Sequence, residues 1–106
     1  MNQLPVAALA KWLADPLRDK PLLLDVREAW EVETAALPNI THIPMQQISA
    51  RASEFDPAME IVAICHHGAR SMQVALFLEQ HGCRVHNLAG GMDAWSREID
   101  PAVPRY

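Results

Sequence analysis

Two short, unbroken apolar runs, each followed by a stretch with helical spacing, restrict the fold of this chain more than any other feature. The runs cover residues 21–26 and 61–64, and segment 84–88 reads as a further strand. Strands that are apolar on both faces are typical of parallel sheets covered on both sides. Apolar residues recur at helical spacing in four segments, which are 6–14, 28–36, 71–81 and 92–99. This alternation predicts an α/β fold with three α/β/α layers and a mostly parallel sheet of roughly five strands.

The remaining segments give weaker signals. Residues 42–44 are predicted as a short edge strand, because Pro44 cannot donate a backbone hydrogen bond. Residues 46–55 are predicted as a weak helix and 101–106 as irregular chain. Trp12 and Trp95 lie on apolar helical faces and are expected in the core. A length of 106 residues with no repeat or linker predicts a single domain over 1–106.

Composition narrows the classes of partner. The net charge of −4 is unsuited to binding nucleic acid, which needs a basic surface. No apolar run approaches the roughly 20 residues of a membrane span, so no membrane partner is expected. The first residues lack the pattern of a secretory signal, and two cysteines are too few for a disulfide framework. We therefore expect a cytoplasmic protein with free thiols.

The segment from Cys65 to Ser71 carries the clearest chemical signal. A buried strand leads directly into a cysteine, and a helix begins a few residues later. The first turn of a helix leaves backbone N–H groups without partners, and its dipole adds partial positive charge. Gly68 allows unusual backbone angles and Arg70 adds a permanent positive charge. Each of these features favours a thiolate over a thiol, so Cys65 is predicted to be an activated nucleophile.

The loop is one of four motifs that follow one another in order along the chain. They are Leu24-Asp25-Val26-Arg27-Glu28, His42-Ile43-Pro44, the loop Cys65-His66-His67-Gly68-Ala69-Arg70-Ser71, and Leu88-Ala89-Gly90-Gly91 followed by Trp95. With these motifs the sequence resembles a single-domain rhodanese, a sulfurtransferase. One departure is Thr41, where the family commonly has glycine, but Thr41 lies outside the loop.

The resemblance implies a two-step reaction. The Cys65 thiolate takes sulfane sulfur from a small donor such as thiosulfate, and a thiol or cyanide then removes it from the resulting persulfide. His66, His67, Gly68, Ala69, Arg70 and Ser71 would form the loop that binds the donor and stabilises the persulfide. Asp25 and Arg27 are expected to form an ion pair that supports this loop. The reaction needs no cofactor and no metal.

Two alternatives remain open. The domain could carry a persulfide to a protein acceptor, with turnover of small donors incidental. Phosphatases and arsenate reductases of related architecture are disfavoured, because their loop has five residues between cysteine and arginine whereas this loop has four. A tighter ring of N–H groups suits a terminal sulfur atom better than a tetrahedral oxyanion.

Several residues near the loop have plainer interpretations. His66 is interpreted as a solvent-facing side chain, and for His67 the functional and solvent-facing interpretations are about equally supported. Cys83 is expected to be a small core residue. Trp30 is interpreted as helix packing. The acidic residues Glu28, Glu31 and Glu33 are expected to form a solvated face.

Overall fold

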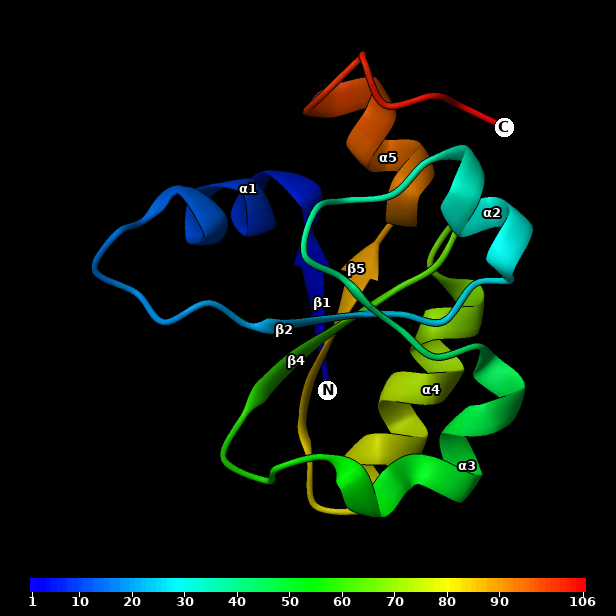
Figure 1. Ribbon diagram of the computed structural model, residues 1–106. Coiled ribbons are helices and arrows are strands. Elements are labelled where there is room, and N and C mark those ends of the chain that lie inside the picture. Colours follow the sequence, from blue (N-terminus) through cyan, green and yellow to red (C-terminus); the bar gives the residue numbers. More distant parts are fainter.

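The centre of the molecule is a parallel sheet of five strands, seen edge-on in the computed structural model, which describes residues 1–106 (Figure 1). Its spatial order is β1-β5-β4-β2-β3, and every neighbouring pair is parallel. The strands are β1 (Asn2–Pro5), β2 (Leu22–Asp25), β3 (Thr41–His42), β4 (Glu60–Ile64) and β5 (Arg84–Ala89). The predicted α/β fold class is confirmed.

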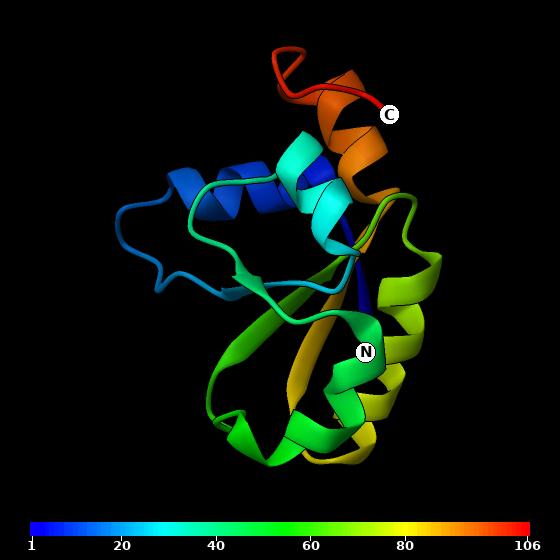
Figure 2. The same cartoon turned by 45° about the vertical axis from the view of Figure 1, so that its right-hand side comes forward.

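Helices cover both faces of the sheet, which gives the three layers (Figure 2). One face is covered by α1 and α5, and the other by α3 and α4. The helices are α1 (Val6–Ala14), α2 (Ala29–Thr34), α3 (Ile48–Arg51), α4 (Ala69–Gln80) and α5 (Gly91–Glu98). Two short 3₁₀ turns, η1 (Met45–Gln47) and η2 (Ala52–Glu54), flank α3. No helix is both long and apolar enough to cross a membrane.

The strand side chains alternate between two apolar clusters, one on each face of the sheet. Leu24 and Ile61 pack on the α3 and α4 side, whereas Leu23 and Val62 pack on the α1 and α5 side. Burial of both faces explains why these strands are continuous apolar runs in the sequence. Trp12 is 2% exposed and Trp95 is 7% exposed, which confirms that both tryptophans belong to the core.

Strand β1 was not predicted from the sequence. Asn2–Pro5 pairs with β5 over four residues, but its side chains are mostly exposed and two of them are polar. A short edge strand of this kind has neither an apolar run nor a clear alternation. The predicted helix over 46–55 is also broken, since only Ile48–Arg51 is α-helical and the flanking residues form 3₁₀ turns.

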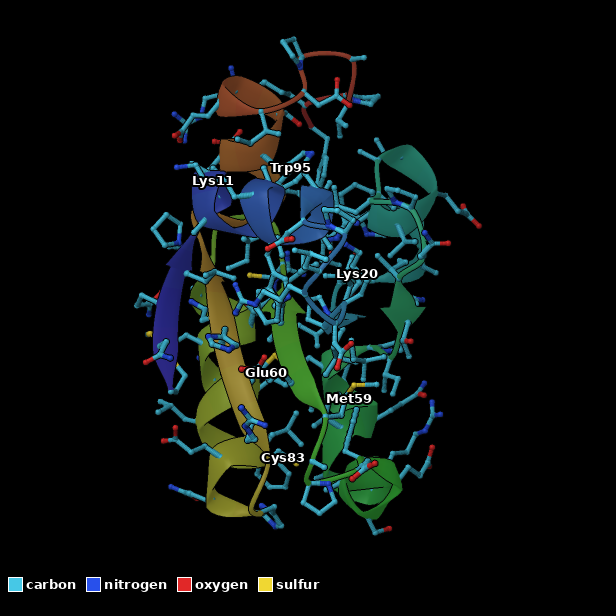
Figure 3. The ribbon with its side chains drawn as sticks, turned by 90° about the vertical axis from the view of Figure 1, so that its left-hand side faces the viewer. Lys11, Lys20, Met59, Glu60, Cys83 and Trp95 are labelled. Carbon is cyan, nitrogen blue, oxygen red and sulfur yellow. The ribbon has the colours of Figure 1, made fainter.

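The topology places the cysteine at the carboxyl edge of a central strand. β4 lies between β2 and β5, and Cys65 follows its last residue. The second cysteine, Cys83, precedes β5 and lies at the end of the molecule opposite Trp95 (Figure 3). Cys83 is 8% exposed, and burial raises the pKa of its thiol. It is the small core residue that was predicted.

Candidate active site

The sulfur of Cys65 lies inside the loop that joins β4 to α4. Its Sγ accepts a hydrogen bond from the Gly68 N–H at 3.0 Å and lies 3.2 Å from Ser71 Oγ. Gly68 has φ = 102°, in the left-handed region that favours glycine, as the sequence predicted. Cys65 as a whole is 1% exposed, so a bulky reagent cannot reach its sulfur in this conformation.

The helix that follows the loop supplies further donors. α4 begins at Ala69, two residues earlier than predicted. The backbone N–H groups of Ala69, Arg70 and Ser71 have no acceptor within the protein, as expected for the first turn of a helix. These groups sit directly after the Gly68 amide that contacts Sγ. The loop and helix start therefore offer a run of donors to negative charge next to the sulfur.

The other side of the loop is fixed by the start of α5. The carbonyl oxygen of Cys65 accepts from Met92 N at 2.9 Å, and that of His66 accepts from Asp93 N at 3.0 Å. Gly91 permits this approach, because a Cβ there would collide with both carbonyls, and its φ is 57°. The loop's carbonyls thus point towards α5, which leaves its N–H groups for the cysteine side.

Arg70 is held by a carboxylate rather than standing free. Its two terminal nitrogens donate to the two oxygens of Glu31, each at 2.7 Å. These hydrogen bonds lower the pKa of Glu31 to about 2 against the opposing effect of burial. Glu31 is 3% exposed, so the expectation that it belongs to a solvated face is wrong. The Arg70 side chain itself is 37% exposed.

Asp25 and Arg27 form the predicted ion pair, and both side chains are fully buried. Arg27 donates to the two Asp25 oxygens at 2.8 and 2.6 Å. Its remaining donors reach the carbonyls of Glu31 and Ala35 and the hydroxyl of Tyr106. The pair thus joins the end of β2 to α2, and it reaches the cysteine loop through the Glu31–Arg70 contact and through Tyr106, whose ring lies against His66.

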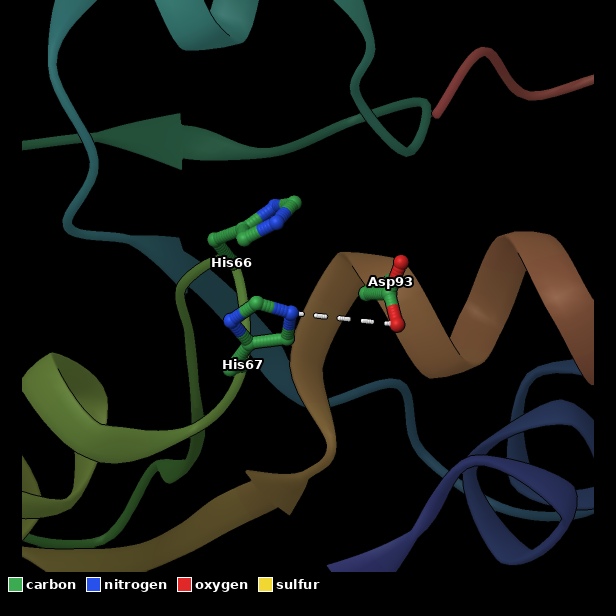
Figure 4. Close-up of side chains that lie close together, drawn as sticks. All are labelled: His66, His67 and Asp93. Atoms are coloured by element: carbon green, nitrogen blue, oxygen red, sulfur yellow. Dashed lines mark ion pairs between the residues drawn. The ribbon is translucent and has the colours of Figure 1, made fainter. Parts of the chain in front are cut away.

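The two loop histidines occupy different environments. His66 stacks against Tyr106 with a ring separation of 4.2 Å, its Nδ1 is buried without a partner, and burial lowers its pKa. The expectation that His66 faces solvent is therefore wrong. His67 is exposed and lies 3.8 Å from a carboxylate oxygen of Asp93 (Figure 4).

His66, His67 and Asp93 are the residues nearest to a metal-binding arrangement, with ligand atoms within 4.8 Å of one another. The Asp93 carboxylate already accepts from Arg97 at 3.0 Å and from Arg105 at 3.2 Å. Two guanidinium groups on one carboxylate oppose a bound cation. This cluster is better suited to stabilising the start of α5 than to holding a metal.

Beside Arg70 the surface is hollowed into a pocket of about 440 Å³. Its lining residues are Val26, Glu28, Met45, Gln46, Ser49 and Arg70. The pocket lies on the side of the loop where the arginine is exposed. It offers space for a small anion or for part of a larger acceptor.

Three residues of the site were not predicted from the sequence. Glu31 was assigned to the surface, and neither Asn87 nor Tyr106 was singled out. Asn87 contacts the loop from β5, and the Tyr106 hydroxyl donates to Glu31 at 3.0 Å. The asparagine lies within an identifiable strand, but the residue that it faces depends on strand order. For Tyr106 the sequence offered no signal.

The comparisons with known proteins agree with this geometry. The chain is 36% identical over 104 residues to a protein named sulfurtransferase from Allochromatium vinosum, covering 97% of this chain and 95% of that protein. It is 36% identical to Rhodanese-like/PpiC domain-containing protein 12 of Arabidopsis thaliana over 100% of this chain, but only 38% of that relative's length. It is 40% identical to the putative sulfur carrier protein YrkF of Bacillus subtilis, covering 74% of this chain and 43% of that protein.

Solved structures show the same architecture. The protein SSP1007 of Staphylococcus saprophyticus superposes with a TM-score of 0.85 at 31% sequence identity, covering 93% of this chain and 97% of that one. The family model of the rhodanese-like domain matches residues 9–98, which include the cysteine loop and every strand except β1. The chain belongs to the rhodanese-like domain family, whose members here carry sulfurtransferase and sulfur-carrier names.

Proposed function

We propose that this protein transfers sulfane sulfur through a persulfide on Cys65. The observation that carries the proposal is the contact between Cys65 Sγ and the Gly68 N–H, in a loop followed by three further amides without partners. A thiolate or a persulfide is an anion, and preorganised amides stabilise such charge without rearrangement. Family membership supports the same chemistry.

With thiosulfate as donor, sulfur transfer takes place in two steps. The Cys65 thiolate attacks the outer sulfur, a sulfur–sulfur bond forms, and the bond to the sulfonate sulfur breaks with sulfite as leaving group. The persulfide then passes its outer sulfur to cyanide or a thiol, and the thiolate is restored. The near-complete burial of Cys65 favours a small donor over a bulky one.

Arg70 contributes less to attracting an anionic donor than its positive charge suggested. Glu31 neutralises its charge, so long-range attraction of an anionic donor is weakened. The exposed part of the side chain lines the adjacent pocket, where it can hold a donor that has already arrived. We therefore assign stabilisation of the transferred sulfur mainly to the backbone amides.

Intact-mass measurement after incubation with thiosulfate tests the proposal. We expect a gain of one sulfur atom that is lost on cyanide treatment. Cys65→Ser should abolish the gain, whereas Cys83→Ser is the matched control and should keep it. Persulfide formation that survives Cys65→Ser would overturn the proposal.

A second role, as a persulfide carrier for a protein acceptor, is favoured by the pocket beside Arg70, which has space for part of a larger acceptor, and by the name of the YrkF relative. It predicts slow turnover of thiosulfate with cyanide, together with rapid loss of the persulfide to a protein thiol. Rapid turnover with both small substrates would favour the enzyme over the carrier.

A further inference from the structure

The side chain of Asn87 lies beside the cysteine loop and has a fixed orientation. It is 2% exposed and projects from β5, where its residue pairs with Ala63, two positions before the cysteine. Its Nδ2 donates to the Gly68 carbonyl at 3.0 Å and to Gln3 Oε1 at 2.9 Å. A backbone carbonyl can only accept, so the Gly68 contact requires the nitrogen on that side. The oxygen, Oδ1, must then face Ser71.

The hydroxyl of Ser71 is therefore shared between two acceptors. Its Oγ lies within hydrogen-bond distance of both Asn87 Oδ1 and Cys65 Sγ. A hydroxyl has one proton and can donate only one of these bonds at a time. Ser71 is fully buried, so water does not supply a second donor.

The Ser71 hydroxyl donates to a different acceptor when Cys65 is a thiol and when it is a thiolate. While Cys65 is a thiol, its S–H can donate to Ser71 Oγ and the hydroxyl donates to Asn87, so every group is satisfied. When the thiol proton leaves to solvent, the Ser71 hydroxyl turns to donate its hydrogen bond to the thiolate. Asn87 Oδ1 then loses its donor in a buried site, which is unfavourable.

We propose that Asn87 is a positioning residue that competes with Cys65 for the single proton of Ser71 and thereby restrains ionisation of the nucleophile. The consequence for sulfur transfer rests on the proposed function, but the competition itself does not. The amide donors of the loop favour the thiolate, whereas Asn87 favours the thiol. Together they set the fraction of reactive sulfur.

Other charged groups around the loop are already paired or are common to all the variants tested. Arg70 of α4 is paired with Glu31 of α2, and Arg27 with Asp25 at the end of β2. Asp93 of α5 is paired with Arg97 and Arg105. His66 and His67 are the two imidazoles of the loop, and no variant alters them.

The test measures the pH midpoint of thiolate formation at Cys65 by ultraviolet absorbance, which does not require a reagent to reach the buried sulfur. All proteins carry Cys83→Ser, and the Cys65→Ser protein supplies the baseline. Asn87→Leu keeps the side-chain shape and removes the competing acceptor, so the midpoint should fall by about one pH unit, as expected for one hydrogen bond to a charged group. Gln3→Ala, the matched control, removes the outer partner of the amide and should leave the midpoint unchanged.

Ser71→Ala, made in the parent protein and in the Asn87→Leu protein, completes a double-mutant cycle. In the parent protein it should shift the midpoint little, because the hydrogen bond that the thiolate gains from the hydroxyl is offset by the one that Asn87 loses. In the Asn87→Leu background it should raise the midpoint by about one pH unit, because the hydroxyl is then free to serve the thiolate. Equal effects of Ser71→Ala in the two backgrounds, or a midpoint unmoved by Asn87→Leu, would overturn the proposal.

Folding of each variant is checked by circular dichroism, and Asn87→Ala replaces Asn87→Leu if the larger side chain is not accommodated. Persulfide formation is measured separately on the same proteins. If the midpoints move as expected but no sulfur is gained, the proposed function fails and the role of Asn87 stands. If sulfur is gained but the midpoints do not move, the role of Asn87 fails alone.

Discussion

Glu31→Gln should weaken the contact between α2 and the start of α4 with very little change in side-chain volume. Both Glu31 oxygens accept from Arg70 at 2.7 Å, and the carboxylate is almost completely buried. An amide keeps one acceptor but turns an NH₂ group towards the second guanidinium nitrogen. One of the two charge-assisted hydrogen bonds is thus replaced by a contact between donors.

The size of the effect follows from the pKa of Glu31, which the Arg70 hydrogen bonds lower from 4.5 to about 2. A difference of this size corresponds to about 3 kcal/mol between the charged and neutral forms. Arg70 is 37% exposed, so solvent screens part of the interaction. We expect a loss of about 2 kcal/mol in the free energy of unfolding at neutral pH.

The sign of the pH dependence is also fixed. The pKa is lower in the folded protein than in the unfolded chain, so the stabilisation is complete well above pH 4.5 and is lost as the pH falls towards 2. Urea unfolding of both proteins from neutral pH downwards should show the gap between wild type and Glu31→Gln closing over this range.

Glu54→Gln is the matched control, because Glu54 forms a similar pair with Arg51 at 2.9 Å but both side chains are exposed. That pair should contribute little to stability, so Glu54→Gln should behave like wild type at every pH. A gap between wild type and Glu31→Gln that stays constant from neutral to acid pH would refute the argument, because it would show that packing and not charge is lost.

Three further substitutions test the supports of the site. Arg27→Met leaves Asp25 charged and unpaired in the interior and should reduce the free energy of unfolding by about 3–5 kcal/mol in urea, whereas adding Asp25→Leu should restore most of the loss. Gly91→Ala drives a Cβ into two loop carbonyls and should lower the melting temperature far more than Gly82→Ala, where only backbone strain of about 1–2 kcal/mol applies. Tyr106→Phe removes a hydroxyl with two partners and should lower the free energy of unfolding by about 1 kcal/mol, and an unchanged value would show that these contacts are not formed in solution.

The features predictable from the sequence are those determined by local pattern. The apolar runs at β2 and β4, the glycine at Gly68 and the helix after the cysteine are each visible within a few residues. The contact between Asp25 and Arg27 was also predictable, because they lie two positions apart in the chain.

The features that were missed depend on contacts between distant segments. Glu31 is buried against Arg70, which is 39 positions away in the chain. No pattern near Glu31 in the sequence indicates this contact. Asn87 approaches the loop only because β5 is the neighbour of β4. Strand order cannot be predicted from a local sequence pattern. β1 was missed for the same reason, since its partner strand lies more than 80 residues away.

These distant contacts have one common effect, which is to immobilise the cysteine loop from three sides. The start of α5 holds two loop carbonyls, α2 holds Arg70 through Glu31, and β5 holds the Gly68 carbonyl through Asn87. A loop held in this way keeps the Gly68 N–H on the sulfur, and the helix-start amides that follow it without partners, before any donor arrives. Stabilisation of a charged sulfur then requires no rearrangement of those donors, which is the condition under which backbone amides are most effective. The fold therefore contributes to the chemistry through residues that never contact the reacting atoms.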